Sequence, residues 1–175
     1  MLRFARLFPV LAVALLATLS FSTPAFADDC QPMFDAGTKF LTVPAHSYTT
    51  ETANGKSRTS EAIHINGAIY INLKDKWIRS KATTQEMLKQ EQENIRDSKT
   101  TCRHVRDESV NGEAAALYMA HSENDTVKSD AQTWISKSKG LPLRTEDDID
   151  TGGGDKRHMS IRYEYGDIQP PAVMQ

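Results

Sequence analysis

The sequence predicts an α+β fold in which one curved antiparallel sheet of about eight or more strands is partly covered by two short helices. Three Asn-Gly pairs, the strongest short hairpin signals, separate segments rich in β-branched and aromatic residues at 54–55, 66–67 and 111–112. Helical spacing of apolar residues is confined to 30–41 and 83–97. A sheet of so many strands tends to curl or close, and its inner face must be covered.

The first 27 residues predict a cleavable export signal. Arg3 and Arg6 precede an apolar run over 7–19, and a small-x-small cleavage site follows at 25–27. The run is shorter than the roughly 20 residues that span a bilayer, which disfavours a permanent anchor. Cys30 follows two aspartates, which disfavours lipidation. We therefore expect residues 1–27 to be removed and the protein to reside in the bacterial periplasm or to be secreted.

The mature chain has the size of one ordinary domain, expected over 28–169 with a flexible tail over 170–175. Loss of two arginines with the signal changes the net charge from −2 to −4, and mild acidity argues against a nucleic-acid partner. Cys30 and Cys102 are expected to form a disulfide in an oxidising compartment. A metal or redox pair is the rival interpretation, which the absence of a C-x-x-C motif disfavours.

The two predicted helices differ in composition. Residues 30–41 carry apolar side chains at helical spacing before Pro44 ends the segment. In the second, Thr83 or Thr84 caps a helix that runs to about Asp97, with Glu86 placed as in a capping box. Its apolar residues are few, namely Met87, Leu88 and Ile95. This indicates a surface helix with a thin buried stripe, and a mobile lid over a cavity is the alternative.

The remaining segments read as strands. They are expected at 47–52, 58–65, 68–73, 77–78, 101–110, 114–122, 127–136, 141–150 and 157–165. The last of these alternates cleanly, so that its apolar side chains share one face: Met159, Ile161, Tyr163 and Tyr165.

The segment Trp134–Leu143 resembles a strand–turn–strand motif, W-x-x-x-x-x-G-L-P, of the LolA/LolB-like periplasmic lipoprotein-carrier superfamily. The order of elements over most of 30–168 is similar as well, including Gly67-Ala68-Ile69-Tyr70 before the helical insertion. The resemblance implies an unclosed β-barrel whose helices cover the concave side. It also implies that acyl chains or other hydrophobic molecules are carried there. The motif is structural rather than catalytic, because Gly140 permits the turn and Pro142 has no backbone N–H to donate to a neighbouring strand.

Pockets for such ligands are mostly apolar with a few polar groups, so aromatic and apolar strand residues are the candidate ligand-facing set. This set is Tyr70, Trp77, Tyr118, Trp134, Met159, Ile161, Tyr163 and Tyr165. Packing of the same side chains in the core between sheet and helices is the rival interpretation for each of them.

No motif predicts catalysis, a metal or a cofactor. There is no G-x-S-x-G, and the five histidines lack metal-ligand spacing. The acidic run 146–150 lacks calcium-loop spacing and is interpreted as a solvated hairpin end. The segment 152–156 lacks the residues of a phosphate-binding loop.

The sequence therefore predicts a non-enzymatic, monomeric periplasmic protein that binds or carries a lipid, an acyl chain or another hydrophobic small molecule. The alternative is an interaction module for an envelope protein, with the barrel interior filled by its own side chains. A hydrolase is the third hypothesis, for which the sequence offers no convergent polar residues.

Overall fold

The computed structural model describes residues 30–74, 76–97 and 99–172, and for 94–97 only the backbone. The expected signal peptide therefore lies outside the described residues. The described part contains two helices and nine strands. The strands are β1 (Ala45–Ala53), β2 (Lys56–Ile65), β3 (Ala68–Leu73), β4 (Lys76–Arg79), β5 (Lys99–Val110), β6 (Glu113–Glu123), β7 (Lys128–Ser136), β8 (Pro142–Asp150) and β9 (Lys156–Tyr165).

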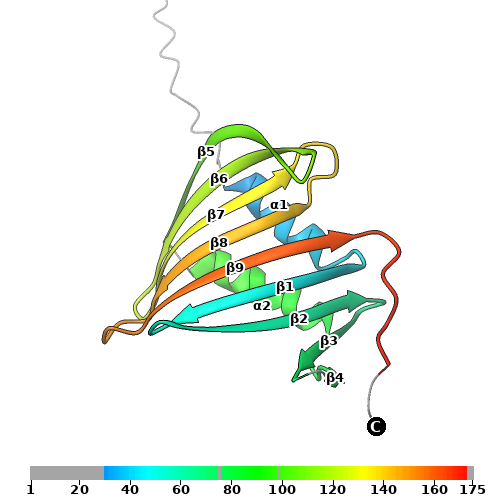
Figure 1. Ribbon diagram of the computed structural model, residues 1–175. Helices are drawn as coiled ribbons and strands as arrows, with labels where there is room; N and C mark the ends of the chain where they lie inside the picture. The colour runs from blue at the N-terminus through cyan, green and yellow to red at the C-terminus, as the bar shows by residue number, and fades with distance from the viewer. Residues whose placement is uncertain (1–29, 75, 98, 173–175) are drawn as a thin grey trace, which may run out of the picture.

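All nine strands belong to one antiparallel sheet in the order β4-β3-β2-β1-β9-β8-β7-β6-β5 (Figure 1). Neighbours in the sheet are neighbours in the chain, except that β9 returns to lie beside β1. The strands β4 and β5 form the two edges, so the sheet curves without closing. This confirms the predicted α+β class and the unclosed barrel with helices on its concave side, the architecture that resemblance to LolA/LolB-like carriers implies.

The hairpins form where the Asn-Gly pairs predict them. Both turn residues have positive φ in each case: 51° and 71° at Asn54-Gly55, 52° and 72° at Asn66-Gly67, and 52° and 84° at Asn111-Gly112. Positive φ at both central residues defines the type I′ turn, whose twist matches that of the flanking strands. The local sequence thus sets the register of the β1–β2, β2–β3 and β5–β6 hairpins.

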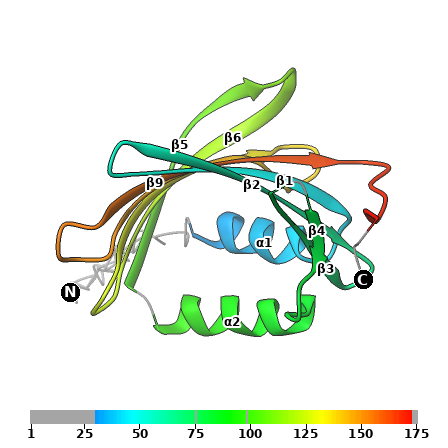
Figure 2. The same cartoon turned by 60° about the horizontal axis from the view of Figure 1, so that its bottom comes forward.

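The two helices form successive layers beneath the sheet. Figure 2 shows the sheet arching over α1 (Gln31–Phe40), with α2 (Thr84–Asp97) on the far side of α1. The predicted capping box is present, because the backbone N–H of Glu86 donates to Thr83 Oγ1 at 3.2 Å and that of Thr83 donates to Glu86 Oε2 at 2.8 Å. None of the helices in the described residues is long and apolar enough to cross a bilayer.

The predicted disulfide is confirmed. Cys30, directly before α1, is bonded to Cys102 of β5, with 4.9 Å between their Cα atoms. The two residues are 72 positions apart, so the bond closes a long loop and holds the start of α1 to an edge strand.

Buried apolar residues gather on both sides of the sheet. On the helix side, α1 buries Ala36 and is followed by the buried Leu41. On the opposite side, Leu117 and Trp134 are buried in a second cluster together with Ala115 and Leu143. The β5–β6 hairpin rises over the outer face in Figure 2, and its Val105 and Val110 pack against this cluster. The outer face of the sheet therefore has a small core of its own.

Candidate functional site

The side of the sheet that faces the helices is identified by Phe40, near the end of α1. Its ring centroid lies 4.7 Å from that of His64 in β2 and 5.0 Å from that of Tyr163 in β9. Residues directly paired across strands share a face, and residues alternate along each strand. Away from the register shifts at His104/Arg106 and Trp134/Ile135, the register therefore assigns each strand residue to the helix side, here called the concave face, or to the opposite, convex face.

The concave face receives five of the eight candidate ligand-facing residues. Ile161 of β9 is paired with Thr145 of β8, Thr145 is paired with Thr133 of β7, and Thr133 is paired with Tyr118 of β6. Ile161 and Tyr118 therefore lie on the same face of the sheet. Alternation along β9 adds the others, so that the concave set is Tyr118, Met159, Ile161, Tyr163 and Tyr165. The sequence pattern predicts the shared face of the four β9 residues, and the structure confirms that shared face.

Three of the eight candidates lie on the convex parity. Tyr70 is paired with Ile63, which is paired with His46, and Trp77 lies on the same face with its ring 5.9 Å from that of His46. Trp134 belongs to the outer core, and its indole N–H donates to Glu108. The prediction groups these three aromatic residues with the other candidates by residue type, whereas the register between strands places them on the opposite face of the sheet.

Tyr165 has the concave parity of β9, but it lies at the end of the sheet, where its side chain reaches the outer cluster. Its hydroxyl donates to the carbonyl oxygen of Pro142 at 2.6 Å, and its ring packs against the cluster around Trp134. Burial raises the pKa of its phenol. This leaves the neighbouring part of β9, from Met159 to Tyr163, as the central strip of the concave face.

Two polar residues on the concave face were not among the sequence candidates. His64 is 6% exposed, its Nδ1 has no hydrogen-bond partner in the described residues, and burial lowers the pKa of its imidazole. Asp147 of β8 is directly paired with Met159. Burial raises the pKa of this carboxyl, although Ser129 Oγ donates to Asp147 Oδ1 at 2.6 Å.

The position of Asp147 corrects the interpretation of the acidic run. Residues 146–150 belong to β8 rather than to the solvated end of a hairpin. Alternation turns Asp147 to the concave face and sends Glu146 and Asp148 to the convex face. The strand predicted over Leu141–Asp150 implies this alternation of faces, but the high content of acidic residues favoured the interpretation as a solvated hairpin end.

The convex face carries a network of paired charges. His121 Nδ1 lies 2.8 Å from Asp130 Oδ1, and His158 Nδ1 lies 2.8 Å from Asp148 Oδ1. His158 Nε2 is also 3.0 Å from Glu146. These hydrogen bonds to Asp130 and Asp148, aided by the other nearby carboxylates, raise the pKa of both imidazoles. His121, Asp130, Asp148 and His158 line part of a pocket of about 510 Å³ on this face. Among the described residues, no cluster of His, Cys, Asp and Glu has the arrangement of a metal site.

The two helices cover the concave face with different firmness. The disulfide holds the start of α1, and near its other end Lys39 Nζ donates to the carbonyl oxygen of Lys139 at 2.6 Å. In α2, Met87 and Leu88 are half-buried and the described residues on its other sides are mostly exposed. Hence α1 is a fixed part of the interior, and α2 is an outer layer with a thin apolar stripe.

Comparisons with known proteins find likeness of structure without likeness of sequence. No protein-family model and no curated protein matches the sequence. Among solved structures, MucB in complex with MucA(peri) is similar at 14% identity with a TM-score of 0.49, over 85% of this chain and 62% of that chain. LprF from Mycobacterium bovis is similar at 9% identity with a TM-score of 0.43, over 83% of this chain and 95% of that chain.

A putative outer membrane lipoprotein-sorting protein domain from Vibrio parahaemolyticus is similar at 7% identity with a TM-score of 0.28, over 79% of this chain and 93% of that chain. The chain thus spans less than two thirds of the length of MucB.

Proposed function

We propose that this protein is a non-enzymatic, periplasmic binding protein that holds a lipid or an acyl chain on the concave face of its sheet. The location follows from the export signal expected over residues 1–27. The ligand class follows from the side chains that the concave face presents.

One observation carries the proposal. The concave face presents apolar side chains along β9 that remain incompletely covered, although the helices lie on that side, and polar residues of β1 and β8 flank them. Met159, Ile161 and Tyr118 all face the helices, and each keeps part of its surface exposed to solvent. Apolar side chains on the covered side of a sheet are ordinarily buried against the layer that covers them. Here a ligand would complete the burial that α1 and α2 leave unfinished.

The energetics favour an extended apolar ligand. Burying a methylene group contributes about 0.8 kcal/mol, so an acyl chain that buries eight of them gains roughly 6 kcal/mol before the costs of immobilisation. The concave face also offers a polar group to orient such a ligand, as binding pockets do. This is the carboxyl of Asp147, directly beside Met159.

A pair of tryptophan substitutions tests the proposal. Ile161→Trp fills the concave face at the centre of β9, and Thr50→Trp places the same side chain on the convex face of the adjacent β1. Titration with a dansyl-labelled long-chain fatty acid is expected to show saturable binding to the unaltered protein and to Thr50→Trp. The Ile161→Trp variant should bind at least tenfold more weakly.

Equal loss of binding in both variants, or binding that neither variant alters, would contradict the concave site. Failure of all three proteins to bind fatty acid or phospholipid would instead favour the envelope interaction module with a filled interior. Circular dichroism of each variant establishes that the fold is retained.

A further inference from the structure

We infer that the β3–β4 edge of the sheet is a docking surface for an anionic lipid bilayer. The surface consists of Leu73, Lys74, Lys76, Trp77, Ile78, Arg79 and Lys81, and it is called the edge patch below. Docking there does not depend on a ligand on the concave face.

The edge patch contains the exposed large apolar side chains of the described residues. Leu73 is 52% exposed and Ile78 is 42% exposed. They lie on adjacent strands, because Ile78 is paired with Ile71 and Leu73 follows Ile71 by two positions. Both therefore point to the concave side of the same edge. Clustered exposed apolar groups mark sites of contact with a membrane or a protein.

The same segment carries a concentration of positive charge. Lys74, Lys76, Arg79 and Lys81 are all exposed, and no carboxylate of the described residues lies within ion-pair distance of any of them. Asp75 is the sole acid in the sequence from 73 to 81. The mature chain has a net charge of −4, so this basic segment stands out against an acidic protein.

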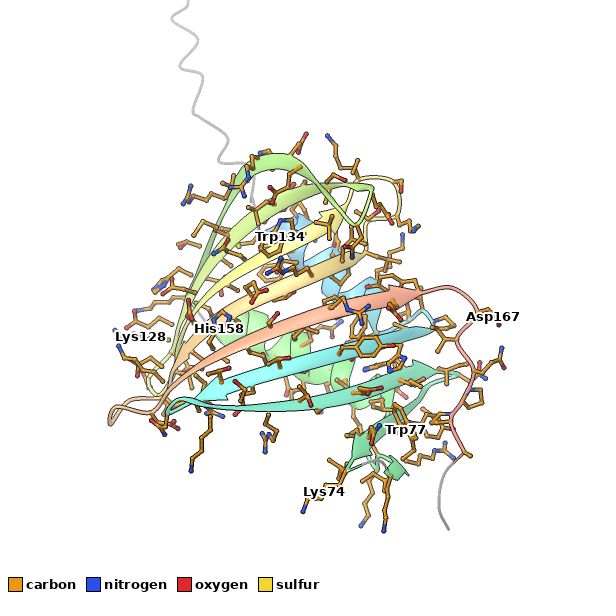
Figure 3. The ribbon with its side chains drawn as sticks, viewed as in Figure 1. Lys74, Trp77, Lys128, Trp134, His158 and Asp167 are labelled. Carbon is orange, nitrogen blue, oxygen red and sulfur yellow. A yellow bond between two sulfur atoms is a disulfide. The ribbon has the colours of Figure 1, made fainter. Side chains whose placement is uncertain are left out.

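Trp77 adds an aromatic group on the convex side of the same edge, opposite to the side of Leu73 and Ile78. It is half-buried, and its ring meets that of His46 edge to face at 5.9 Å. Figure 3 shows Trp77 at the free edge of the sheet and Lys74 projecting outward from the tip. Tryptophan and basic residues beside exposed aliphatic side chains are the composition of segments that lie at a membrane–water interface.

The patch is continuous with the apolar part of the concave face. Along β3, Ile69 is 5% exposed, Ile71 is half-buried and Leu73 is 52% exposed, and all three share one face. The exposure therefore rises along β3 toward the turn between β3 and β4. A molecule that leaves the concave face toward this edge would remain in contact with apolar side chains.

A bilayer fits the patch better than an acidic protein does. Stable protein interfaces bury about 800 Å² on each partner with a packed apolar centre, whereas the exposed apolar groups here are two side chains, Leu73 at the end of β3 and Ile78 on the four-residue edge strand β4. Anionic membranes attract each nearby basic residue with about 1 kcal/mol, and the two aliphatic side chains would enter the headgroup region. Four cations, offset in part by Asp75, and two apolar groups therefore favour reversible docking.

Co-sedimentation of the full mature chain with vesicles tests the inference. We expect binding to vesicles of phosphatidylglycerol and phosphatidylcholine, weak binding to phosphatidylcholine alone, and release at about 0.5 M salt, where charges are screened. Lys74→Gln combined with Lys76→Gln should weaken binding roughly thirtyfold, which corresponds to about 1 kcal/mol for each lysine. Leu73→Ser combined with Ile78→Ser should weaken it at least tenfold.

The matched control removes the same charge elsewhere. Lys128 pairs with Glu123 at 3.2 Å and Lys156 with Asp150 at 3.6 Å, on strands that β1 and β2 separate from the edge patch. Lys128→Gln combined with Lys156→Gln should leave vesicle binding unchanged. Absence of binding to anionic vesicles, or equal loss in the edge-patch and control variants, would overturn the inference.

The two proposals fail separately. The Leu73→Ser, Ile78→Ser variant should bind the dansyl fatty acid as the unaltered protein does, because neither residue belongs to the central strip of β9. A protein that bound vesicles through the edge patch but no fatty acid would contradict the proposed function and retain the docking surface. Binding of the edge patch to an acidic polypeptide with no affinity for anionic vesicles would overturn the membrane as its partner.

Discussion

The two faces of this sheet differ in how their polar side chains are paired. On the convex face, polar side chains have close partners: Glu146 accepts from Arg144 Nε at 2.7 Å and from Ser160 at 2.9 Å, and it lies 3.0 Å from His158. On the concave face, His64 Nδ1 is buried without a partner in the described residues, and the pKa of Asp147 is raised by burial. Satisfied polar networks rigidify a structure, whereas buried polar atoms without partners are commonly found where a ligand or water completes them. This contrast supports the proposal that the convex face contributes stability and that the concave face binds the ligand.

The largest expected effect concerns the bond that holds the concave cover to the sheet. Replacement of both Cys30 and Cys102 by Ala should lower the free energy of unfolding by about 4 kcal/mol, because a loop of about 70 residues is no longer closed in the unfolded chain. Urea denaturation with and without a reducing agent measures this loss. Reduction of the unaltered protein should reproduce the variant, and an unfolding midpoint that ignores both changes would contradict the structural role of the disulfide.

A pair of truncations separates stability from binding. Leu117 is 1% exposed in the outer core, so Leu117→Ala should cost about 3 kcal/mol through lost burial and a residual cavity, without weakening fatty-acid binding to the folded protein. Ile161→Ala on the concave face should cost about 1 kcal/mol, because its side chain is only half-buried, and should weaken binding. Chemical denaturation and dansyl titration of both variants test this separation of stability from binding. Weaker fatty-acid binding by Leu117→Ala, with unchanged binding by Ile161→Ala, would contradict it.

The histidines of the two faces should respond to pH with opposite sign. His121 and His158 have raised pKa values, so their stabilisation is complete below about pH 6.5 and is lost as the pH rises through the folded-state pKa. His64 has a lowered pKa, so its contribution is complete above about pH 6.5 and is lost as the pH falls toward the folded-state pKa.

Urea unfolding between pH 5 and 8 measures these contributions. The variant with both His121→Gln and His158→Gln should lose less stability than the unaltered protein as the pH rises above about 6.5, whereas His64→Leu should lose less as the pH falls below it. Parallel pH profiles for the two variants would contradict the contrast between the faces.

The smallest effect is expected in the outer helix. Thr83→Ala removes the capping box of α2 and should cost that helix about 1 kcal/mol. Because α2 carries only a thin apolar stripe, the loss should appear as faster amide exchange in α2 while exchange in α1 stays unchanged. Slower exchange in α2 than in α1 would contradict the firmer attachment of the inner helix.

Local signals predicted the elements well. The Asn-Gly turns and the Thr83–Glu86 capping box lie within a few residues in the chain, so their geometry depends on neighbours that the sequence displays directly. The alternation of β9 likewise placed Met159 and Ile161 on one face. The pairing of β9 with β1 joins strands more than 100 residues apart, and hairpin signals do not determine such a contact.

The candidate site was predicted only in part, because it depends on register between strands. Trp134 lies on the convex face beside a register shift between it and Ile135, which no turn signal reveals. Tyr70 alternates with Ile69 and Ile71, and only the contact of Phe40 with the sheet decides which parity faces the helices. The inward position of Asp147 was hidden by its acidic neighbours. Residue type suggested the ligand class, and tertiary packing decided which residues present it.

Native mass spectrometry of the protein purified without detergent tests the central claim most directly. The account predicts a population with one lipid or fatty acid bound, and a further mass shift when ligand-free protein is incubated with fatty acid or phospholipid. A single ligand-free mass that no added lipid shifts would contradict a binding site on the concave face.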